Sequence, residues 1–380
     1  MRLFDNLNID FMGKRTTFYF ISAGLLLFGL VMIIVKGLHF GIDFKGGTEI
    51  ALQFDKPVDI AYVRTQADQL GIGNVEVKTF GSSTGILLRT ELQEIPKAVV
   101  PKVKERVETL IDQIMPGIKK TLIDSSLYSI TYNFASADTA TLMVDKLFKA
   151  GYQQASKLSA DQTSTAVVVP LRIADMIKNN LAEKFKDNNF TVVKEDKVGP
   201  KVGNELKRNT IWAVIISLGA ILIYLGFRFK FAFAFGAVIA LFHDVLLTLG
   251  IFAALYGVIP ALNLEFTVTV VAAFLTLVGY STNDTVIVFD RVREQMKIHK
   301  SLSIEENMNH AINRTMSRTI ITVFTVMISI IVLLFFGGEV LRGFAFALFI
   351  GMITGTYSSV FIASAFVLEV AHRTKRKIEF

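Results

Sequence analysis

The sequence predicts a membrane protein with a bundle of six helical spans and one α+β domain outside the membrane. Three observations support this. Hydrophobic residues make up 52% of the 380 residues and charged residues only 19%, a more apolar balance than a soluble protein carries. Six segments are apolar over roughly the 20 residues that a helix needs to cross the hydrocarbon. A long segment between the first and second of them instead alternates strand-like and helix-like stretches.

The first span is expected over residues 16–36, after a cytoplasmic N-terminus of residues 1–15. Lys14 and Arg15 precede it, as in a signal peptide, but its apolar core is longer than usual there and no A-x-A-like cleavage site follows. We therefore expect it to remain as an anchor. A five-helix bundle is expected over residues 209–370, with spans at 209–227, 232–255, 266–289, 319–336 and 343–368.

The short connections predict the orientation, because Lys and Arg collect in cytoplasmic loops. Such cations occupy the N-terminus, the second-to-third and fourth-to-fifth connections and the tail of residues 371–380, whereas Tyr256 to Leu264 contains none. Both termini are therefore expected in the cytoplasm and residues 37–208 outside it. The cations are Arg2, Lys14, Arg15, Arg228, Lys230, Arg291, Arg293, Lys297, Lys300, Arg314, Arg373, Lys375, Arg376 and Lys377.

The outer segment has the pattern of a soluble α+β domain. Its strand-like stretches are rich in apolar and β-branched residues, and Pro57, Val58 and Asp59 open a helix that Gly71 closes. The order of elements predicts a ferredoxin-like split βαβ sandwich. Strands are expected at Thr48–Phe54, Val75–Thr79, Gly85–Arg89, Tyr128–Asn133, Ala166–Pro170 and Phe190–Lys194. Helices are expected at Asp59–Leu70, Asp138–Lys149 and Arg172–Lys186, with one or two basic amphipathic helices over Pro96–Lys120.

Several classes of function are disfavoured. The net charge of +7 is distributed around hydrophobic segments rather than on one basic face, so we expect no nucleic-acid partner. With no cysteine and five histidines outside metal-ligand spacing, we expect no metal site. We find no nucleophile with a positioned base and no nucleotide loop, so we expect no cofactor and no enzyme activity.

Asp284 is the most informative residue of the fourth span. It is the only acid between Phe266 and Phe289 and lies in a polar run that includes Tyr280 and Asn283. A charge at membrane depth costs roughly 2.5 to 3.5 kcal/mol, so it needs a partner, water or a proton. Thr276, Tyr280 and Asp284 share one helix stripe, which should face protein or water. The alternative is that Asp284 only hydrogen-bonds neighbouring hydroxyls and fixes the helix packing.

The third span contains a second candidate pair, His243 and Asp244. Adjacent helical residues point about 100° apart, so the two cannot both face one partner directly. Asp244 either handles protons or ions or has a buried, hydrogen-bonded packing role. His243 fits a neutral core histidine better than a functional one.

Arg318 precedes the fifth span and can be an ordinary cytoplasmic flank. The apolar run that follows it is only 18 residues long, to Phe336, so the bilayer can draw Arg318 partly into the hydrocarbon. A carboxylate would then be its natural partner, and a nearby Asp284 would be a switchable one. In the last span, Gly351 and Gly355 form a G-x-x-x-G pattern that permits the close approach of another helix.

Five motifs resemble one known family. The longest lies in the fourth span, where such a polar run is unusual. Through these motifs the chain is similar over nearly its whole length to the SecF family of the bacterial protein-export machinery, within the resistance-nodulation-division (RND) superfamily. The motifs are GLHFGIDFKGGT at Gly37–Thr48, VGPKVGNEL at Val198–Leu206, VGYSTNDTVIVFDRVRE at Val278–Glu294, SRTIIT at Ser317–Thr322 and FGGEVLRGFA at Phe336–Ala345.

This resemblance implies a half-bundle of RND type, completed by six spans of SecD into a pseudo-symmetric whole. It implies association with the SecYEG translocon, with YajC as a further candidate, and use of the protonmotive force to assist the export of unfolded polypeptides across the inner membrane. The family's proton-pathway aspartate falls on Asp284 and its functional arginine on Arg318, with their acidic counterpart on SecD. The outer segment is longer than is usual in that family, and we expect the insertion at Leu92–Tyr128.

Two rival functions remain. One is an RND-type proton-driven exporter of small molecules or lipids, although such chains usually carry both halves and about twelve spans. The other is a structural scaffold for membrane assembly without ion coupling. Copurification with a SecD-like partner, as opposed to self-association, would separate the first rival from the export function.

Overall fold

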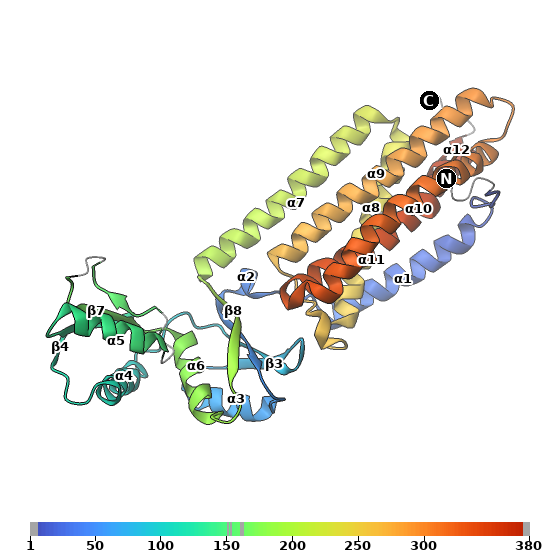
Figure 1. The fold of residues 1–380 in the computed structure, drawn as a ribbon. Helices are drawn as coiled ribbons and strands as arrows, with labels where there is room; N and C mark the ends of the chain where they lie inside the picture. The colour runs from blue at the N-terminus through green and yellow to red at the C-terminus, as the bar shows by residue number, and fades with distance from the viewer. Residues whose placement is uncertain (1–6, 150–151, 153, 160–162, 375–380) are drawn as a thin grey trace. The chain divides into compact units, whose positions relative to one another are not determined.

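The computed structural model describes residues 7–149, 152, 154–159 and 163–374. The chain forms two compact units. One comprises Met1–Gly41 and Glu205–Phe380, and we call it the helical unit. The other comprises Ile42–Asn204, and we call it the α+β unit. Figure 1 draws both units and labels many of their helices and strands.

Six helices of the described residues are long and apolar enough to cross a membrane. The last candidate span is continuous through three segments, because α11 passes into a π-helical turn, η2, and then into α12. A short 3₁₀ turn, η1 (Pro260–Leu262), lies between α8 and α9. The helices are α1 (Arg15–Lys36), α7 (Pro200–Arg228), α8 (Phe231–Leu255), α9 (Val268–Ile298), α10 (Ile304–Phe336), α11 (Gly338–Ser358), η2 (Ser359–Ser364) and α12 (Ala365–Thr374).

The six spans differ in how much of each is covered by this chain. In the most apolar window of α8, α9 and the last span, 50%, 56% and 67% of the residues are buried. In α1, α7 and α10 the share is 11%, 6% and 11%. Helices α8, α9 and α11 therefore form the core of the helical unit. The other three turn most of their apolar surface outward, as expected of helices in contact with lipid or with another chain.

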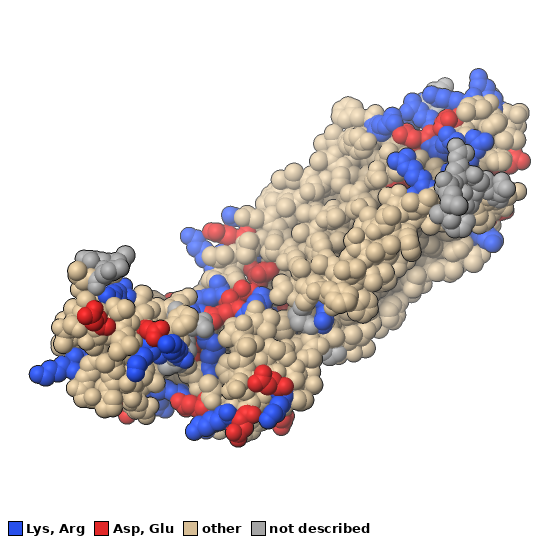
Figure 2. Space-filling view, viewed as in Figure 1, with Lys and Arg blue, Asp and Glu red and all other residues tan. Residues whose placement is uncertain are grey.

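Charged side chains are unevenly distributed over the surface of the helical unit. On the face seen in Figure 2, a broad tan band without Lys, Arg, Asp or Glu covers the helices, and charges gather at their ends. At one of these ends, the start of α1 contacts the start of α10. There Arg15 lies 3.3 Å from Glu305, and the Phe11 amide donates to Asn309 Oδ1 at 3.0 Å. The last described turn of α12 lies at this end too (Figure 1).

The cations that predicted a cytoplasmic face occur at this same end wherever the structure describes them. The span order places the α7–α8 and α9–α10 connections there, together with the start of α1 and the end of α12. Arg228 of the first connection pairs with Asp290 of α9 at 2.6 Å. Arg2 and the tail cations Lys375, Arg376 and Lys377 lie outside the described residues.

The first sheet of the α+β unit has the predicted ferredoxin-like order, β2-β3-β1-β8, with every neighbouring pair antiparallel. Helix α3 connects β1 to β2, and α6 leads into β8, so two βαβ units interlock. Asp59 begins α3 as predicted, because its Oδ1 accepts from the Ala61 amide at 2.9 Å. The elements are β1 (Gly47–Phe54), α3 (Ile60–Asp68), β2 (Val75–Phe80), β3 (Ser82–Thr90), α6 (Ile173–Lys184) and β8 (Phe190–Val198), preceded by the short α2 (Ile42–Lys45).

A second four-stranded antiparallel sheet, ordered β4-β5-β7-β6, is inserted between β3 and α6. The stretch Leu92–Tyr128, expected as an insertion relative to the family, contains only α4 and β4 of these elements, and β5, α5, β6 and β7 also precede the return to the first sheet. Sequence patterns cannot show which sheet a strand joins, so they could not place this boundary. The inserted elements are α4 (Val100–Ile114), β4 (Lys120–Ser125), β5 (Ser129–Phe134), α5 (Ala137–Lys149), β6 (Ser156–Lys157) and β7 (Ala166–Pro170).

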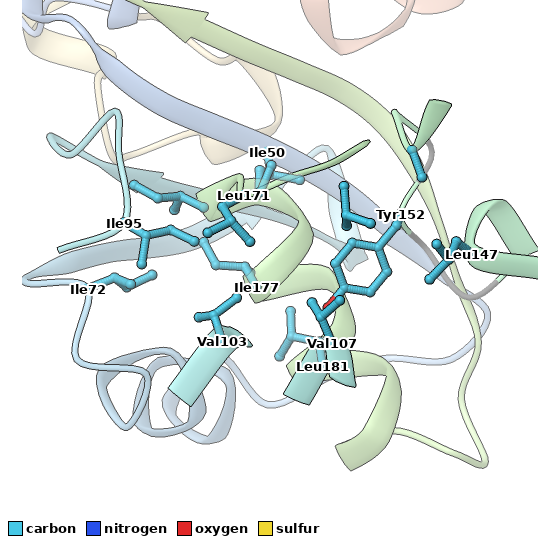
Figure 3. Close-up of a cluster of buried hydrophobic side chains, with 14 of the residues drawn as sticks. Ile50, Ile72, Ile95, Val103, Val107, Leu147, Tyr152, Leu171, Ile177 and Leu181 are labelled. Atoms are coloured by element: carbon cyan, nitrogen blue, oxygen red, sulfur yellow. The ribbon is translucent and has the colours of Figure 1, made fainter. Parts of the chain in front are cut away.

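One hydrophobic core serves both sheets. The cluster combines Ile50 of β1 with Ile130 of β5, and helices α4 and α6 contribute Val107 and Ile177. Figure 3 shows the α4 and α6 side chains pointing toward one another, with Tyr152 among them. The inserted sheet is thus part of the same domain. Burial raises the pKa of the Tyr152 phenol, against a smaller opposite effect of a hydrogen bond with Asn179.

The predicted fold class is confirmed, and two strands were missed. All six expected strands and four expected helices of the outer segment form, with shifted ends. Strand β4 was missed because it is an edge strand whose side chains are almost all exposed, so it lacks an apolar alternation. The helix expected over Pro96–Lys120 is only α4, which buries Val103, Val107 and Ile111 on one stripe.

Two glycines bring α1 and α8 into backbone contact. A Cβ atom on Gly250 would lie 2.4 Å from the Gly29 Cα atom, and one on Gly29 would lie 3.1 Å from the Gly250 Cα atom. Small residues at such crossings allow the van der Waals packing that holds membrane helices together. This contact attaches α1 to the core of the bundle.

We therefore predict that Gly250→Ala lowers the free energy of unfolding by about 1 to 3 kcal/mol, because the added methyl forces α1 away from α8. Gly24→Ala is the matched control, since nothing lies within 4 Å of a Cβ atom there. Unfolding of the purified protein in detergent, followed by circular dichroism, measures both. Equal stability of the two variants would contradict the predicted contact.

Candidate functional site

The polar run of α9, residues 280–285, faces two ways. Ser281, Thr282, Asp284 and Thr285 are buried, whereas Asn283 is exposed. Asp284 lies six residues before Asp290, the next acid of α9, or about 9 Å along the axis at about 1.5 Å per residue. Asp284 is thus well inside the apolar part of the span.

The described part of this chain offers Asp284 few hydrogen-bond donors. Among the described residues, the one side chain that donates to it is Thr356 of α11, whose Oγ1 lies 3.4 Å from Oδ2. The Thr356 hydroxyl also lies 3.0 Å from the Met352 carbonyl, so its donor is shared. A cavity of about 10 Å³ adjoins the carboxylate, barely the space for one water molecule. A negative charge on Asp284 is therefore weakly compensated inside this unit.

The other two residues of the predicted stripe, Tyr280 and Thr276, are more exposed than Asp284. Tyr280 is half-buried and lines the same small cavity, whereas Thr276, one turn further from Asp284, is exposed. Asn283 has no hydrogen-bond partner among the described residues. The stripe therefore runs from a buried carboxylate to the outer face of the helical unit, rather than into its centre.

Arg318 is exposed on α10 and makes no ion pair with Asp284 within 4.0 Å in the described part of the chain. It lies on α10, the helix that packs against α9, so its positive charge is on a helix next to that of the carboxylate. The two interpretations of Arg318 both remain. A guanidinium on this face either reaches toward the headgroups along its apolar stem or meets an acidic partner outside this chain.

Asp244 has the opposite environment. It is 1% exposed and accepts hydrogen bonds from Ser281 Oγ at 2.6 Å and Ser358 Oγ at 2.8 Å. Its other oxygen lies 3.0 Å from Nδ1 of His243. These three neighbours provide what a packing role for Asp244 requires.

His243 is equally buried but only partly satisfied. Its ring turns toward the carboxylate of the adjacent residue, a local pairing that sequence reasoning about helix faces did not consider. Its Nε2 atom has no hydrogen-bond partner among the described residues.

Helices α9 and α11 connect the two carboxylates. On α9, Ser281 binds Asp244 from the turn next to Asp284; on α11, Thr356 binds Asp284 and Ser358 binds Asp244. A movement of α9 along α11 would therefore change the surroundings of both acids. We call Asp244, Ser281, Asp284, Thr356 and Ser358 the polar core.

The G-x-x-x-G pattern makes this close approach possible. A Cβ atom on Gly355 would lie 3.1 Å from the Ser281 Cβ atom, and one on Gly351 would lie 2.5 Å from Leu277. The helix that these glycines accommodate is thus α9 of the same chain.

A π-helical turn follows the polar core directly. η2 widens the helix after Ser358, and its hydroxyls bond within and across helices. Ser359 Oγ lies 2.8 Å from Thr285 Oγ1, and Ser364 Oγ donates to the Ser359 carbonyl at 2.9 Å. Such turns occur frequently at functional sites, where they break the regular ladder and allow local rearrangement.

Sequence reasoning singled out both acids but missed the hydroxyls that bind them. These hydroxyls belong to Ser281, Thr356 and Ser358. Two adjacent serines in an otherwise apolar span were the available signal. Among the described residues, no three His, Asp or Glu side chains lie close enough to hold a metal ion.

We predict that Asp244→Ala lowers the free energy of unfolding by about 2 to 3 kcal/mol, because it leaves two buried hydroxyls and His243 without their acceptor. Asp290→Ala is the control, since the pair of Asp290 with Arg228 is partly exposed and worth about 1 kcal/mol at most. Thermal unfolding in detergent compares the two. An Asp244→Ala protein as stable as Asp290→Ala would argue against the network.

Two family models match the chain. The model of the protein export membrane protein SecD/SecF, C-terminal, matches residues 177–373. The SecD/SecF GG motif matches residues 31–58, which include Gly46 and Gly47. The structure shows why a glycine is needed at the start of β1. Gly47 has a φ of 120°, and a Cβ atom there would lie 2.2 Å from the Thr90 carbonyl oxygen.

Curated relatives match over nearly the whole chain. The protein translocase subunit SecF of Rhodothermus marinus is 35% identical over 377 residues, covering 98% of this chain and 96% of that protein. The SecF subunit of Petrotoga mobilis is 33% identical over 369 residues, covering 97% and 98%.

Solved structures extend the likeness to the fold. The crystal structure of SecDF from Thermus thermophilus, described as a translocon-associated membrane protein, is 28% identical with a TM-score of 0.66. SecDF in a super-membrane-facing form gives a TM-score of 0.56 at 28% identity. This chain is covered to 98% in both but spans only 40% of the length of each SecDF chain.

Proposed function

The chain belongs to the SecD/SecF family as a SecF subunit of the Sec protein-export machinery, and from this premise we propose that it uses the protonmotive force to assist polypeptide export. It is a multi-pass membrane transport subunit and not an enzyme. The observation that carries the proposal is Asp284, a buried carboxylate in a candidate span whose one side-chain donor among the described residues is a shared hydroxyl, with the exposed Arg318 on the adjacent helix α10.

The proton would act through the charge of Asp284. Ionised, the carboxylate is costly in hydrocarbon and attracts the guanidinium of Arg318; protonated, it carries no charge and loses that attraction. Because α9 also bears Ser281, a displacement of Asp284 strains the hydrogen bonds to Asp244 and, through Ser358, reaches α11. Through the polar core, protonation of Asp284 would thus be coupled to movement of α9 and α11. Tyr280 and Asn283 would lie between Asp284 and the outer face of the helical unit.

A second chain would complete the site. The likeness to SecDF implies association with SecD, which would supply the remainder of the bundle. Two exposed groups at membrane depth support this: the Asn283 amide and the Arg318 guanidinium would be unpaired in lipid. Helix α7 supports it too, because nearly all of its apolar surface is left uncovered by this chain.

The remaining assignments follow from the family and the charge pattern. Both termini would lie in the cytoplasm, because the basic connections gather at one end of the helical unit. The α+β unit would then lie outside and contact SecD or the emerging unfolded polypeptide, while the SecYEG translocon and YajC would be neighbours in the inner membrane. A small-molecule or lipid exporter of the same superfamily, or an uncoupled scaffold, are the alternatives that the experiments must exclude.

We predict that Asp284→Asn leaves insertion intact but abolishes the stimulation of export by the protonmotive force, because the amide cannot change its charge. Inverted membrane vesicles with the variant as sole copy, with and without an uncoupler, measure this. Asp290→Asn, on the same helix but paired with Arg228 at its end, is the control that should retain stimulation. Full stimulation in the Asp284→Asn vesicles would refute the proposal, and a scaffold would be indifferent to variant and uncoupler alike.

We further predict that exposed positions of α7 contact SecD. The chain contains no cysteine, so single cysteines can carry a photo-activated cross-linker without background. Ile216→Cys and Ile223→Cys, on exposed residues two turns apart, should cross-link to SecD, whereas Leu225→Cys, on a fully buried residue, should not. Cross-links only between copies of this chain would favour the exporter alternative.

A further inference from the structure

Two asparagines of α10 hold the backbone that precedes α1. The Asn313 side chain accepts from the Ile9 amide at 3.0 Å and donates to the Ile9 carbonyl at 2.8 Å. The Asn309 Oδ1 atom accepts from the amides of Phe11 and Met12, each at 3.0 Å. Residues four apart lie on the same face of a helix, so both asparagines hold one segment of chain. We call Asn309 and Asn313 the asparagine clamp.

Side-chain contacts complete this attachment. Asn309 Nδ2 donates to Asp10 Oδ1 at 2.8 Å, and the same oxygen accepts from the Gly13 amide at 2.8 Å. These hydrogen bonds lower the pKa of the Asp10 carboxyl, the Gly13 amide more than Asn309. Phe11 and Met12 are buried in a hydrophobic cluster to which α10 contributes. The segment before α1 is therefore fixed to α10 by its backbone, by one carboxylate and by two apolar side chains.

Only one half of α10 is firmly packed within this chain. Its buried residues form a stripe from Asn307 to Thr319, and beyond Thr319 the one further buried residue of the helix is Ile330. Arg318 lies at the end of the packed half, nine residues after Asn309. At about 100° per residue it is on the opposite face of the helix from Asn309. A rotation or slide of α10 at the clamp would therefore move Arg318 as well.

The register of α10 against α9 decides which of their residues lie at one level. The two helices pack against each other and are joined by residues 299–303. Asp284 lies 14 residues before the end of α9, and Arg318 lies 14 residues after the start of α10. At about 1.5 Å per residue, both are about 21 Å along their helices from the connection. A slide by one helical turn would separate the two levels by about 5.4 Å.

Hydrogen bonds to backbone groups are well suited to fix this register. In hydrocarbon, apolar contacts between helices resist sliding only weakly, because lipid tails replace them at little loss. Hydrogen bonds have preferred directions and lengths, so the clamp opposes both rotation and sliding. The held segment continues into α1, which meets α8 at Gly29. The clamp therefore ties α10 to a helix that is itself attached to the core of the bundle.

We propose that Asn309 and Asn313 are positioning residues for Arg318: by holding Ile9–Met12 they set the rotation and register of α10, and thereby keep Arg318 level with Asp284. The inference rests on the proposed function, because it concerns the arginine placed beside the helix of the proton-carrying carboxylate. It gives the segment before α1 a role in coupling, although that segment lies far from both charged groups in the sequence.

A distance between two spin labels tests the positioning directly. The chain has no cysteine, so Ala272→Cys on α9 and Ile320→Cys on α10, both at exposed positions, label each helix once in the full-length protein bound to SecD. We expect Asn309→Ala/Asn313→Ala to shift or broaden this distance by about 2 Å or more, the size of helix shifts at packed interfaces. Thr315→Ala is the control.

Thr315 is a matched control because it is buried on α10 between the clamp and Arg318, and its hydroxyl bonds only to carbonyls of its own helix. Its replacement loosens α10 locally without touching the held segment, so the labelled distance should stay within about 1 Å of the unmodified protein. An unchanged distance in the clamp variant, or an equal change in Thr315→Ala, would overturn the proposal.

A swap of two side chains tests whether the hydrogen bonds themselves position Arg318. Asn309→Asp alone places two carboxylates side by side, because Asn309 Nδ2 lies 2.8 Å from Asp10 Oδ1. Asp10→Asn/Asn309→Asp again sets a donor opposite an acceptor and keeps an acceptor for the amides of Phe11 and Met12. In inverted vesicles, the single variant should lower the stimulation of export by the protonmotive force about threefold or more, and the swap should restore it to within about twofold.

The two readouts separate a failure of the clamp from a failure of the proposed function. The labelled distance does not depend on proton transfer, so it reports on the clamp even where Asp284→Asn vesicles keep full stimulation. A clamp variant with a shifted distance and full stimulation, beside Asp284→Asn vesicles that have lost it, would show that the position of α10 does not matter for coupling. A swap variant that stays impaired would equally contradict the role of these hydrogen bonds.

Discussion

The cost of polar and charged groups in hydrocarbon is the constraint on which the helical unit depends. Two carboxylates lie at membrane depth, and the chain treats them differently. Asp244 receives two serine hydroxyls and a histidine nitrogen, which together fix it in the centre of the bundle. Asp284 receives one shared threonine hydroxyl beside a cavity of about 10 Å³. A group that is fully satisfied resists change, so the weakly satisfied carboxylate is the better candidate for a change of state.

Close helix contacts decide whether such a change can spread. Gly351 and Gly355 bring α11 against α9, so that hydroxyls of one helix reach the acids of its neighbours. With larger residues there, Thr356 and Ser358 would stand further from their acceptors. Because packed interfaces have discrete arrangements, a small shift of α9 favours a new register over a gradual deformation. The π-helical turn at Ser359–Ser364 lies next to this contact and provides a segment that can adjust.

Much of the fold and the identity of both acids could be predicted from the sequence, because each depends on local information. Span length, the Asp59 helix start and strand alternation are all read within a few residues. The partners of Asp244 could not be predicted in this way, since Ser281 is 37 residues and Ser358 is 114 residues distant in sequence. Strand β4 was missed because an exposed edge strand carries no periodic signal, although its partner β5 is the next strand in the chain. The extent of the inserted sheet could not be predicted, because β5 pairs with β7, which follows α5 and β6.

The exposed surface of the helical unit has polar and apolar parts, and these need different neighbours. Asn283 is an exposed polar residue of a candidate span, and hydrocarbon cannot offer it hydrogen bonds, so it requires protein or water. Phe227 and Phe231 are exposed apolar rings where one apolar span ends and the next begins, so lipid is a suitable neighbour for them. Most of α7 is apolar all round and compatible with either neighbour. The face around Asp284 therefore needs protein or water beside it, whereas the exposed apolar end of α7 is compatible with lipid.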